Sequence, residues 1–192
     1  MARHYITVLI CAVFLLMPFA SPAVPDIKAR NIYYMIGGKT IDAIKTDIRK
    51  KTPVKHNGKR HVAYTKWDVN WRFWWLESTD ACKITRVATT LDVAYTLPKL
   101  EQQSAMPAAL LERWENYYSA LFDHEQGHKD LGLKAATEIE QAIANMEPRT
   151  SCSQLERDAN ELAKAVISKY SRLEKEYDRT THHGRNTGVI LR

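Results

Sequence analysis

The chain has 192 residues, of which 45% are hydrophobic and 26% charged, and its formal net charge is +6. This length fits a single domain, and the composition excludes a disordered or low-complexity protein. Basic residues occur along the whole chain, so we expect ordinary solvated charge and no nucleic-acid partner. We also expect a monomer.

The N-terminus has the pattern of a secretory signal peptide. Arg3 precedes an apolar run from Tyr5 to Phe19, and the small residues Ser21 and Ala23 follow. The run is shorter than the ~20 residues that a membrane-spanning helix needs, which favours a cleaved signal over an anchor. We predict a signal peptide at residues 1–23, a single domain at 24–192, a secreted or periplasmic location, and no stable membrane insertion after cleavage.

The first half of the mature chain predicts strands and one short helix. Residues 30–36 have strand character, and the spacing of Ile41, Ile44 and Ile48 predicts a helix capped by Thr40. Residues 52–60 read as a loop. Apolar residues then alternate over 63–75 and again over 87–97, which predicts an antiparallel hairpin that Pro98 ends. We expect the tryptophan-rich face of its first strand to be core.

The second half predicts two helices. One begins at Pro107, keeps helical apolar spacing through Ile143 and ends before Pro148. The other follows a capping box at Ser153 and continues to Tyr177, with a polar tail after it. The predicted fold is α+β, with a small antiparallel sheet packed on the long helix and on the C-terminal helix.

The cysteines predict one disulfide bond. Cys11 lies in the predicted signal, which leaves Cys82 and Cys152 as an even pair in an oxidising compartment. The alternative, two zinc-binding thiolates, lacks the short paired spacing of a zinc knuckle.

The segment His124-Glu125-Gln126-Gly127-His128 matches HExxH within the long helix. Residues four apart lie on one face of a helix, so both imidazoles can bind one ion. Glu125 lies about 100° round the helix axis, where it can act as general base. The alternative is a helix in which these histidines are ordinary core residues.

A hydrolytic zinc site commonly has three protein ligands, so a third is needed. Leu131 and Lys134 stand where the metzincin pattern requires glycine and histidine, which excludes that subclass. His183 follows the final helix, and Gly184 beside it permits a close backbone approach. We predict His183 as the third ligand. One alternative is the neighbouring His182, and another is a downstream glutamate, with Glu138, Glu161 and Glu174 available. The last alternative is a frayed basic tail without a site.

These motifs resemble a bacterial domain family that is labelled as of unknown function and described as predicted secreted zinc-dependent proteases. The matching features are the HEQGH segment at 124–128, the Tyr-Asp-x-x-Thr-x-His-Gly run at 177–184, the strand from Trp67 to Trp75 and the two mature cysteines. The resemblance implies a zincin-like metal site. Its Thr-x-His-Gly element favours His183 over His182.

The expected activity is peptide-bond hydrolysis with one Zn²⁺ ion, Glu125 as general base, and a peptide or protein as substrate. Tyr177 and Arg179 are candidates to donate to the oxyanion, although packing in the core is the favoured role for Tyr177. Asp178 is a candidate for orienting a ligand histidine, and Thr181 for supporting the site. The alternative function is a non-catalytic zinc-binding or peptide-binding envelope protein.

Overall fold

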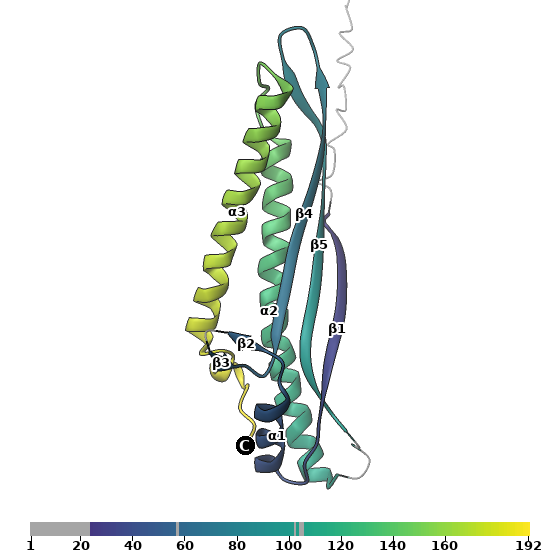
Figure 1. Ribbon diagram of the computed structural model, residues 1–192, viewed down its shortest axis with the longest axis vertical. Coiled ribbons are helices and arrows are strands. Elements are labelled where there is room, and N and C mark those ends of the chain that lie inside the picture. Colours follow the sequence, from purple (N-terminus) through teal and green to yellow (C-terminus); the bar gives the residue numbers. More distant parts are fainter. Residues whose placement is uncertain (1–23, 57, 102, 104–105) are drawn as a thin grey trace, which may run out of the picture.

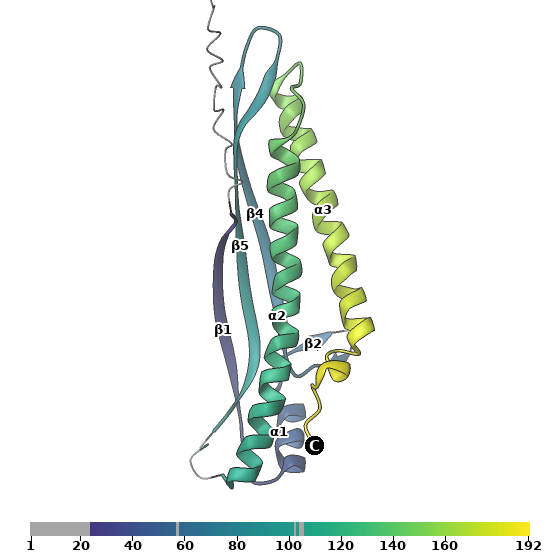
Figure 2. The same cartoon turned by 180° about the vertical axis from the view of Figure 1, so that it is seen from behind.

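The computed structural model describes residues 24–192 apart from residues 57, 102, 104 and 105, so the predicted signal peptide lies outside the described residues. A long, narrow sheet runs beside two long helices (Figures 1 and 2). The elements, in chain order, are β1 (Asp26–Ile36), α1 (Ile41–Lys51), β2 (Lys55–His56), β3 (Lys59–Arg60), β4 (Tyr64–Glu77), β5 (Cys82–Leu100), α2 (Ala108–Ala144), α3 (Cys152–Thr181) and a 3₁₀ turn (Arg185–Thr187).

The main sheet is mixed, with strand order β1-β5-β4. β4 and β5 form the predicted antiparallel hairpin, whereas β1 pairs with β5 in parallel. The expectation of a purely antiparallel sheet is therefore wrong, although the α+β class is confirmed. Alternation of apolar residues identifies a strand but carries no information on its direction relative to a partner far along the chain.

β5 continues beyond Pro98, contrary to expectation. β4 begins at Tyr64, opposite Thr96, so within the described part of the chain β5 pairs at Pro98 with β1 alone. A proline is tolerated where one side of the strand has no ladder to complete.

Both boundaries of the final helix also differ from the prediction. The N-cap is Ser151, whose side chain accepts from the Gln154 N–H, rather than Ser153. At the other end α3 continues through Thr181 and includes Asp178, which the sequence reading placed in a polar tail.

The core lies between the sheet and the two long helices. Buried side chains of β5 pack against small and branched residues of α2 and α3. From β4, the indole N–H of Trp67 donates to Glu174 at 2.6 Å and that of Trp71 donates to Asn160 at 2.9 Å, so the polar ends of these rings are satisfied by α3. Trp75 is exposed because a bulge at Trp74/Trp75 interrupts the alternation.

Cys82 and Cys152 form the predicted disulfide, which joins the start of β5 to the start of α3 across 70 positions of sequence. No helix among the described residues has the length and apolar character needed to cross a bilayer.

Reduction of this disulfide, or the double variant Cys82→Ser/Cys152→Ser, is expected to destabilise the fold. Releasing a loop of this length costs about 4 kcal/mol on the chain-entropy account. For a domain of this size that corresponds to a melting temperature lower by roughly 10 °C. Calorimetry with and without reductant measures this shift in melting temperature, and an unchanged melting temperature would contradict the prediction.

Candidate metal site

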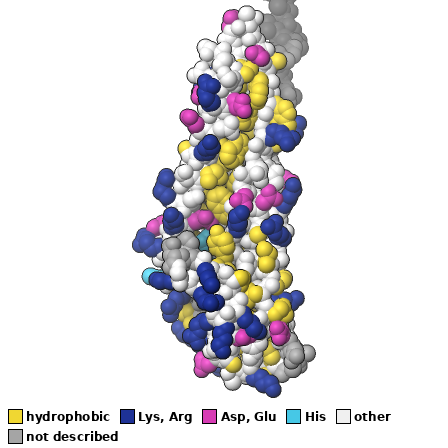
Figure 3. Space-filling model, viewed as in Figure 1, with side chains coloured by type: hydrophobic (Ala, Val, Ile, Leu, Met, Phe, Trp, Pro, Cys, Tyr) yellow, Lys and Arg dark blue, Asp and Glu magenta, His cyan; other side chains and the backbone are white. Residues whose placement is uncertain are grey.

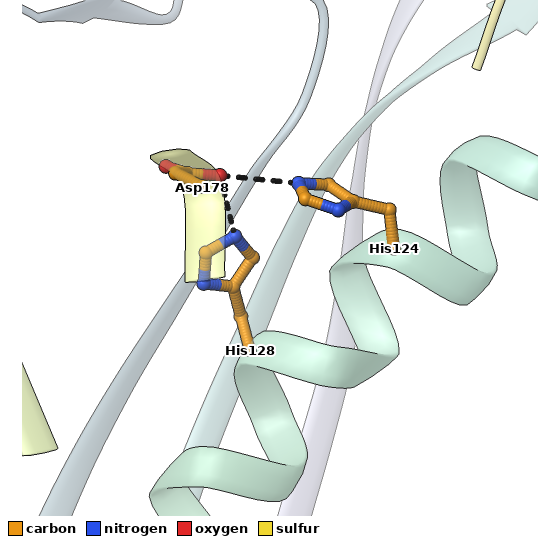
Figure 4. Close-up of side chains that lie close together, drawn as sticks. All are labelled: His124, His128 and Asp178. Atoms are coloured by element: carbon orange, nitrogen blue, oxygen red, sulfur yellow. Dashed lines mark hydrogen bonds and ion pairs between the residues drawn. The ribbon is translucent and has the colours of Figure 1, made fainter. Parts of the chain in front are cut away.

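His124, Glu125 and His128 lie on the face of α2 that is turned toward β4 and α3, and all three are buried. Figure 4 shows both imidazoles pointing at one carboxylate, that of Asp178 on α3. The Nε2 atoms of His124 and His128 are each 3.2 Å from Asp178 Oδ1. Two helices therefore bring three ligand-type side chains to one point.

The spacing of these atoms suits a metal ion. His124, His128 and Asp178 each offer one ligand atom, and these atoms all lie within 4.8 Å of one another. Around a tetrahedral zinc with bonds of 2.0–2.1 Å, adjacent ligand atoms are about 3.3 Å apart. The two distances of 3.2 Å to Asp178 Oδ1 match that edge, so the group could hold a metal ion.

His183 lies beside this group but outside it. Its Nδ1 is 3.3 Å from Asp178 Oδ1, its side chain is 62% exposed, and its ring lies against that of His61. His182 and His183 both have positive φ angles, which L residues adopt at a cost. His183 therefore lies next to Asp178, and Asp178 rather than His183 forms the group with His124 and His128. The role of His183 as third ligand stays a prediction.

Gly184 explains how the turn can lie so close to the site. Its φ is +78°, and a Cβ there would come within 2.4 Å of Val189 Cγ2 and 3.0 Å of His124 Cγ. Thr181 accepts from the Gly184 N–H at 3.3 Å and donates to the Tyr177 carbonyl at 2.7 Å. Thr181 therefore links the turn to the end of α3.

Tyr177 packs on the HExxH segment. Its ring stacks on that of His124, and its hydroxyl donates to the His124 carbonyl at 3.3 Å. A Cβ at Gly127 would come within 2.2 Å of that hydroxyl, which explains why the third position after His124 is a glycine. The guanidinium of Arg179 is paired with Glu176 and exposed. The Tyr177 hydroxyl and the Arg179 guanidinium thus have other partners here, and an oxyanion role for either residue stays a prediction.

Two further residues contact the site: Thr65, which had no signal in the sequence, and Glu174, which the sequence offered only as an alternative third ligand. The hydroxyl of Thr65 on β4 donates to Glu125 Oε2 at 2.5 Å, and Glu174 Oε1 on α3 is 3.3 Å from His128 Nδ1. The same Glu174 oxygen accepts from Trp67. A carboxylate on the far nitrogen of a metal-binding imidazole fixes its tautomer and orientation, which is the position that Glu174 occupies.

The carboxylates and imidazoles shift one another's pKa values. Burial alone would lower the pKa of His128, but hydrogen bonds to Asp178 and Glu174 outweigh it and raise this pKa to about 9. Burial alone would raise the pKa of Asp178, but its hydrogen bonds with His124 and His128 hold it well below the usual range. Burial raises the pKa of Glu125, opposed by the Thr65 hydrogen bond and both imidazoles.

Metal binding to the metal-free protein is therefore expected to release a proton near pH 7.5. With its pKa at about 9, His128 is largely protonated there and must become neutral to bind. Titration calorimetry in buffers of different ionisation enthalpy counts this release, which should approach roughly one proton and vanish as the pH rises above that pKa.

The variant Glu174→Gln tests whether the released proton comes from His128. It removes one of the two carboxylates whose hydrogen bonds raise the pKa of His128, while Asp178 and the nearby charge of Glu125 remain, so the release at pH 7.5 should fall. Equal proton release by the two proteins would contradict the assignment of the proton to His128.

The fold and site define an α+β protein with a candidate metal centre between two helices, of the HExxH type. The chain belongs to the DUF922 family of bacterial proteins of unknown function, whose sequence profile matches residues 31–184. No curated protein and no solved structure matches it.

Proposed function

We propose that this protein is a zinc-dependent peptidase that works outside the cytoplasm. The observation that carries the proposal is the convergence of His124, His128 and Asp178, with the buried carboxylate of Glu125 on the same helix. Two imidazoles and a carboxylate are a common ligand set for zinc in hydrolases.

A bound zinc would polarise the substrate carbonyl and lower the pKa of a water molecule from 15.7 toward ~7. Glu125 is suited to the proton transfers, because burial raises its pKa toward the working pH while the Thr65 hydrogen bond fixes its position. It accepts the proton of the attacking water and passes it to the leaving amine. His183 is proposed either as a further ligand or as the hydrogen-bond partner that orients Asp178.

The proposed compartment rests on two features. The pattern at residues 1–23 is typical of a signal peptide. The Cys82–Cys152 disulfide is compatible with an extracellular or periplasmic location, where such bonds persist.

Digestion of an unbiased peptide library tests the proposal. The purified protein is compared in three states: zinc-loaded, stripped with a chelator, and reloaded with zinc. We expect cleavage in the first and third states and none in the second. Cleavage that persists in the stripped protein, or no cleavage of any peptide by protein with zinc bound, would overturn it.

A further inference from the structure

The net charge of the protein is concentrated in one short segment beside the candidate site. Residues 39–60 contain eight Lys and Arg against two Asp, a net charge of +6 that equals the net charge of the whole chain. The rest of the chain is therefore close to neutral, which differs from the dispersed charge expected from composition.

These basic residues form one surface, called here the basic surface and made of Lys39, Lys45, Arg49, Lys50, Lys51, Lys55, Lys59 and Arg60. The guanidinium of Arg60 donates to the carbonyl of Lys50 at 3.2 Å, which holds β3 against the end of α1. In Figure 3, Lys and Arg side chains gather over the end of the molecule where Figure 1 places α1, β2 and β3.

Most of these cations have no carboxylate partner. The two aspartates of the segment pair with Lys45 and Lys51. Among the described residues, no carboxylate forms an ion pair with the other six: Lys39, Arg49, Lys50, Lys55, Lys59 and Arg60. The helix dipole favours basic residues in the last turn of α1, but it gives no reason for the cations on β2 and β3.

The basic surface borders the candidate metal site. His61 directly follows Arg60, and its ring centroid is 5.5 Å from that of His183, whose Nδ1 contacts Asp178. A bound polypeptide that extends from the metal site past His183 and His61 would therefore reach β3 and then α1.

We propose that the basic surface binds an acidic segment of the peptidase substrate, next to the bond that is cleaved. The inference rests on the proposed function and adds a substrate class to it: polypeptides with a run of Asp or Glu beside the scissile bond. Clustered charge of one sign steers an oppositely charged partner and raises its rate of association.

Two other polyanions fit less well. A membrane-bound helix inserts an apolar face between lipids, whereas Ile44 and Ile48 of α1 are buried in the core of this protein. Single-stranded nucleic acids bind where aromatic rings stack on bases, and residues 39–60 contain no Phe, Tyr or Trp.

Binding is measured by fluorescence anisotropy with a labelled deca-glutamate peptide, and a deca-glutamine peptide serves as the neutral comparison. The protein carries Glu125→Gln, so that the readout does not depend on cleavage. The test variant adds Lys55→Glu and Lys59→Glu. The matched control adds Lys83→Glu and Arg157→Glu, which make the same charge change at exposed positions near the Cys82–Cys152 disulfide.

We expect deca-glutamate to bind more tightly than deca-glutamine, and the test variant to lose roughly 10-fold or more in affinity while the control keeps it. Binding of deca-glutamate should also weaken as the salt concentration rises from 50 to 300 mM. Equal losses in the two variants, or no preference for deca-glutamate, would overturn the inference. Zinc content and melting temperature verify that both variants are folded.

Two further measurements separate the possible failures. If vesicles containing phosphatidylglycerol bind through Lys55 and Lys59 and deca-glutamate does not, the surface binds membranes and the inference is wrong. If the library is cleaved without preference for acidic flanks, the inference fails while the peptidase stands. If deca-glutamate binds as expected but no peptide is cleaved, the proposed function fails while the docking surface stands.

Discussion

Glu125→Gln is expected to remove peptide cleavage while leaving zinc in place. A general acid–base residue typically contributes 10²–10⁴-fold to the rate, so kcat should fall by roughly that factor. The amide has the size of the carboxylate and retains an oxygen that accepts from Thr65. It cannot take a proton from water. Kinetics on a cleaved library peptide, together with metal analysis, measures both properties.

Glu140→Gln is a closely matched control. Glu140 lies on the same helix, is buried, and accepts from the Thr89 hydroxyl at 2.6 Å much as Glu125 accepts from Thr65. Its substitution removes a buried carboxylate without touching the ligand group, so activity should be retained. Undiminished cleavage by Glu125→Gln would exclude Glu125 as the base. Zinc binding without cleavage in the wild type would favour the non-catalytic alternative.

Asp178→Ala and His183→Ala are expected to differ strongly in zinc affinity. Loss of an outer partner of a metal ligand typically costs 10–100-fold in affinity, and loss of a ligand costs more. Because Asp178 belongs to the group with His124 and His128, its removal should weaken zinc binding by more than ~100-fold. His183 contacts only Asp178 within that group, so its removal should cost roughly 10–100-fold.

Competition with a chromophoric zinc chelator measures both dissociation constants. Glu176→Ala serves as the control, since Glu176 lies on α3 two residues before Asp178 but pairs with the exposed Arg179. The reverse order, with the larger loss at His183, would show that His183 is the third ligand, as its position after the final helix and the Thr-x-His-Gly element predict.

The parts of the site that lie within one helix were predictable from sequence. The i, i+4 spacing of His124 and His128 places both on one face of any helix that contains them, and the structure brings both to one carboxylate. The cysteine pair was predictable too, because assigning Cys11 to the predicted signal peptide leaves one pairing, which the structure contains. The paired β4–β5 hairpin followed from period-two alternation.

The contacts made by other elements were only partly predictable. Thr65 had no signal in the sequence, whereas Glu174 was an alternative third ligand and Asp178 a candidate for orienting a ligand histidine. Thr65 reaches Glu125 and Glu174 reaches His128 because β4 and α3 both pack on the HExxH face. Asp178 was placed in a tail because the last apolar residue of α3 is Tyr177, whereas the helix continues to Thr181. One further helical turn is enough to direct its carboxylate at the two imidazoles.

The most direct test is the zinc content of the purified protein beside that of His124→Ala/His128→Ala, after dialysis against trace zinc. The site predicts one zinc ion per chain in the wild type and none in the double variant, with the melting temperature of both proteins confirming that they are folded. Equal zinc content in the two proteins, or a wild type that retains none, would contradict a metal centre between α2 and α3.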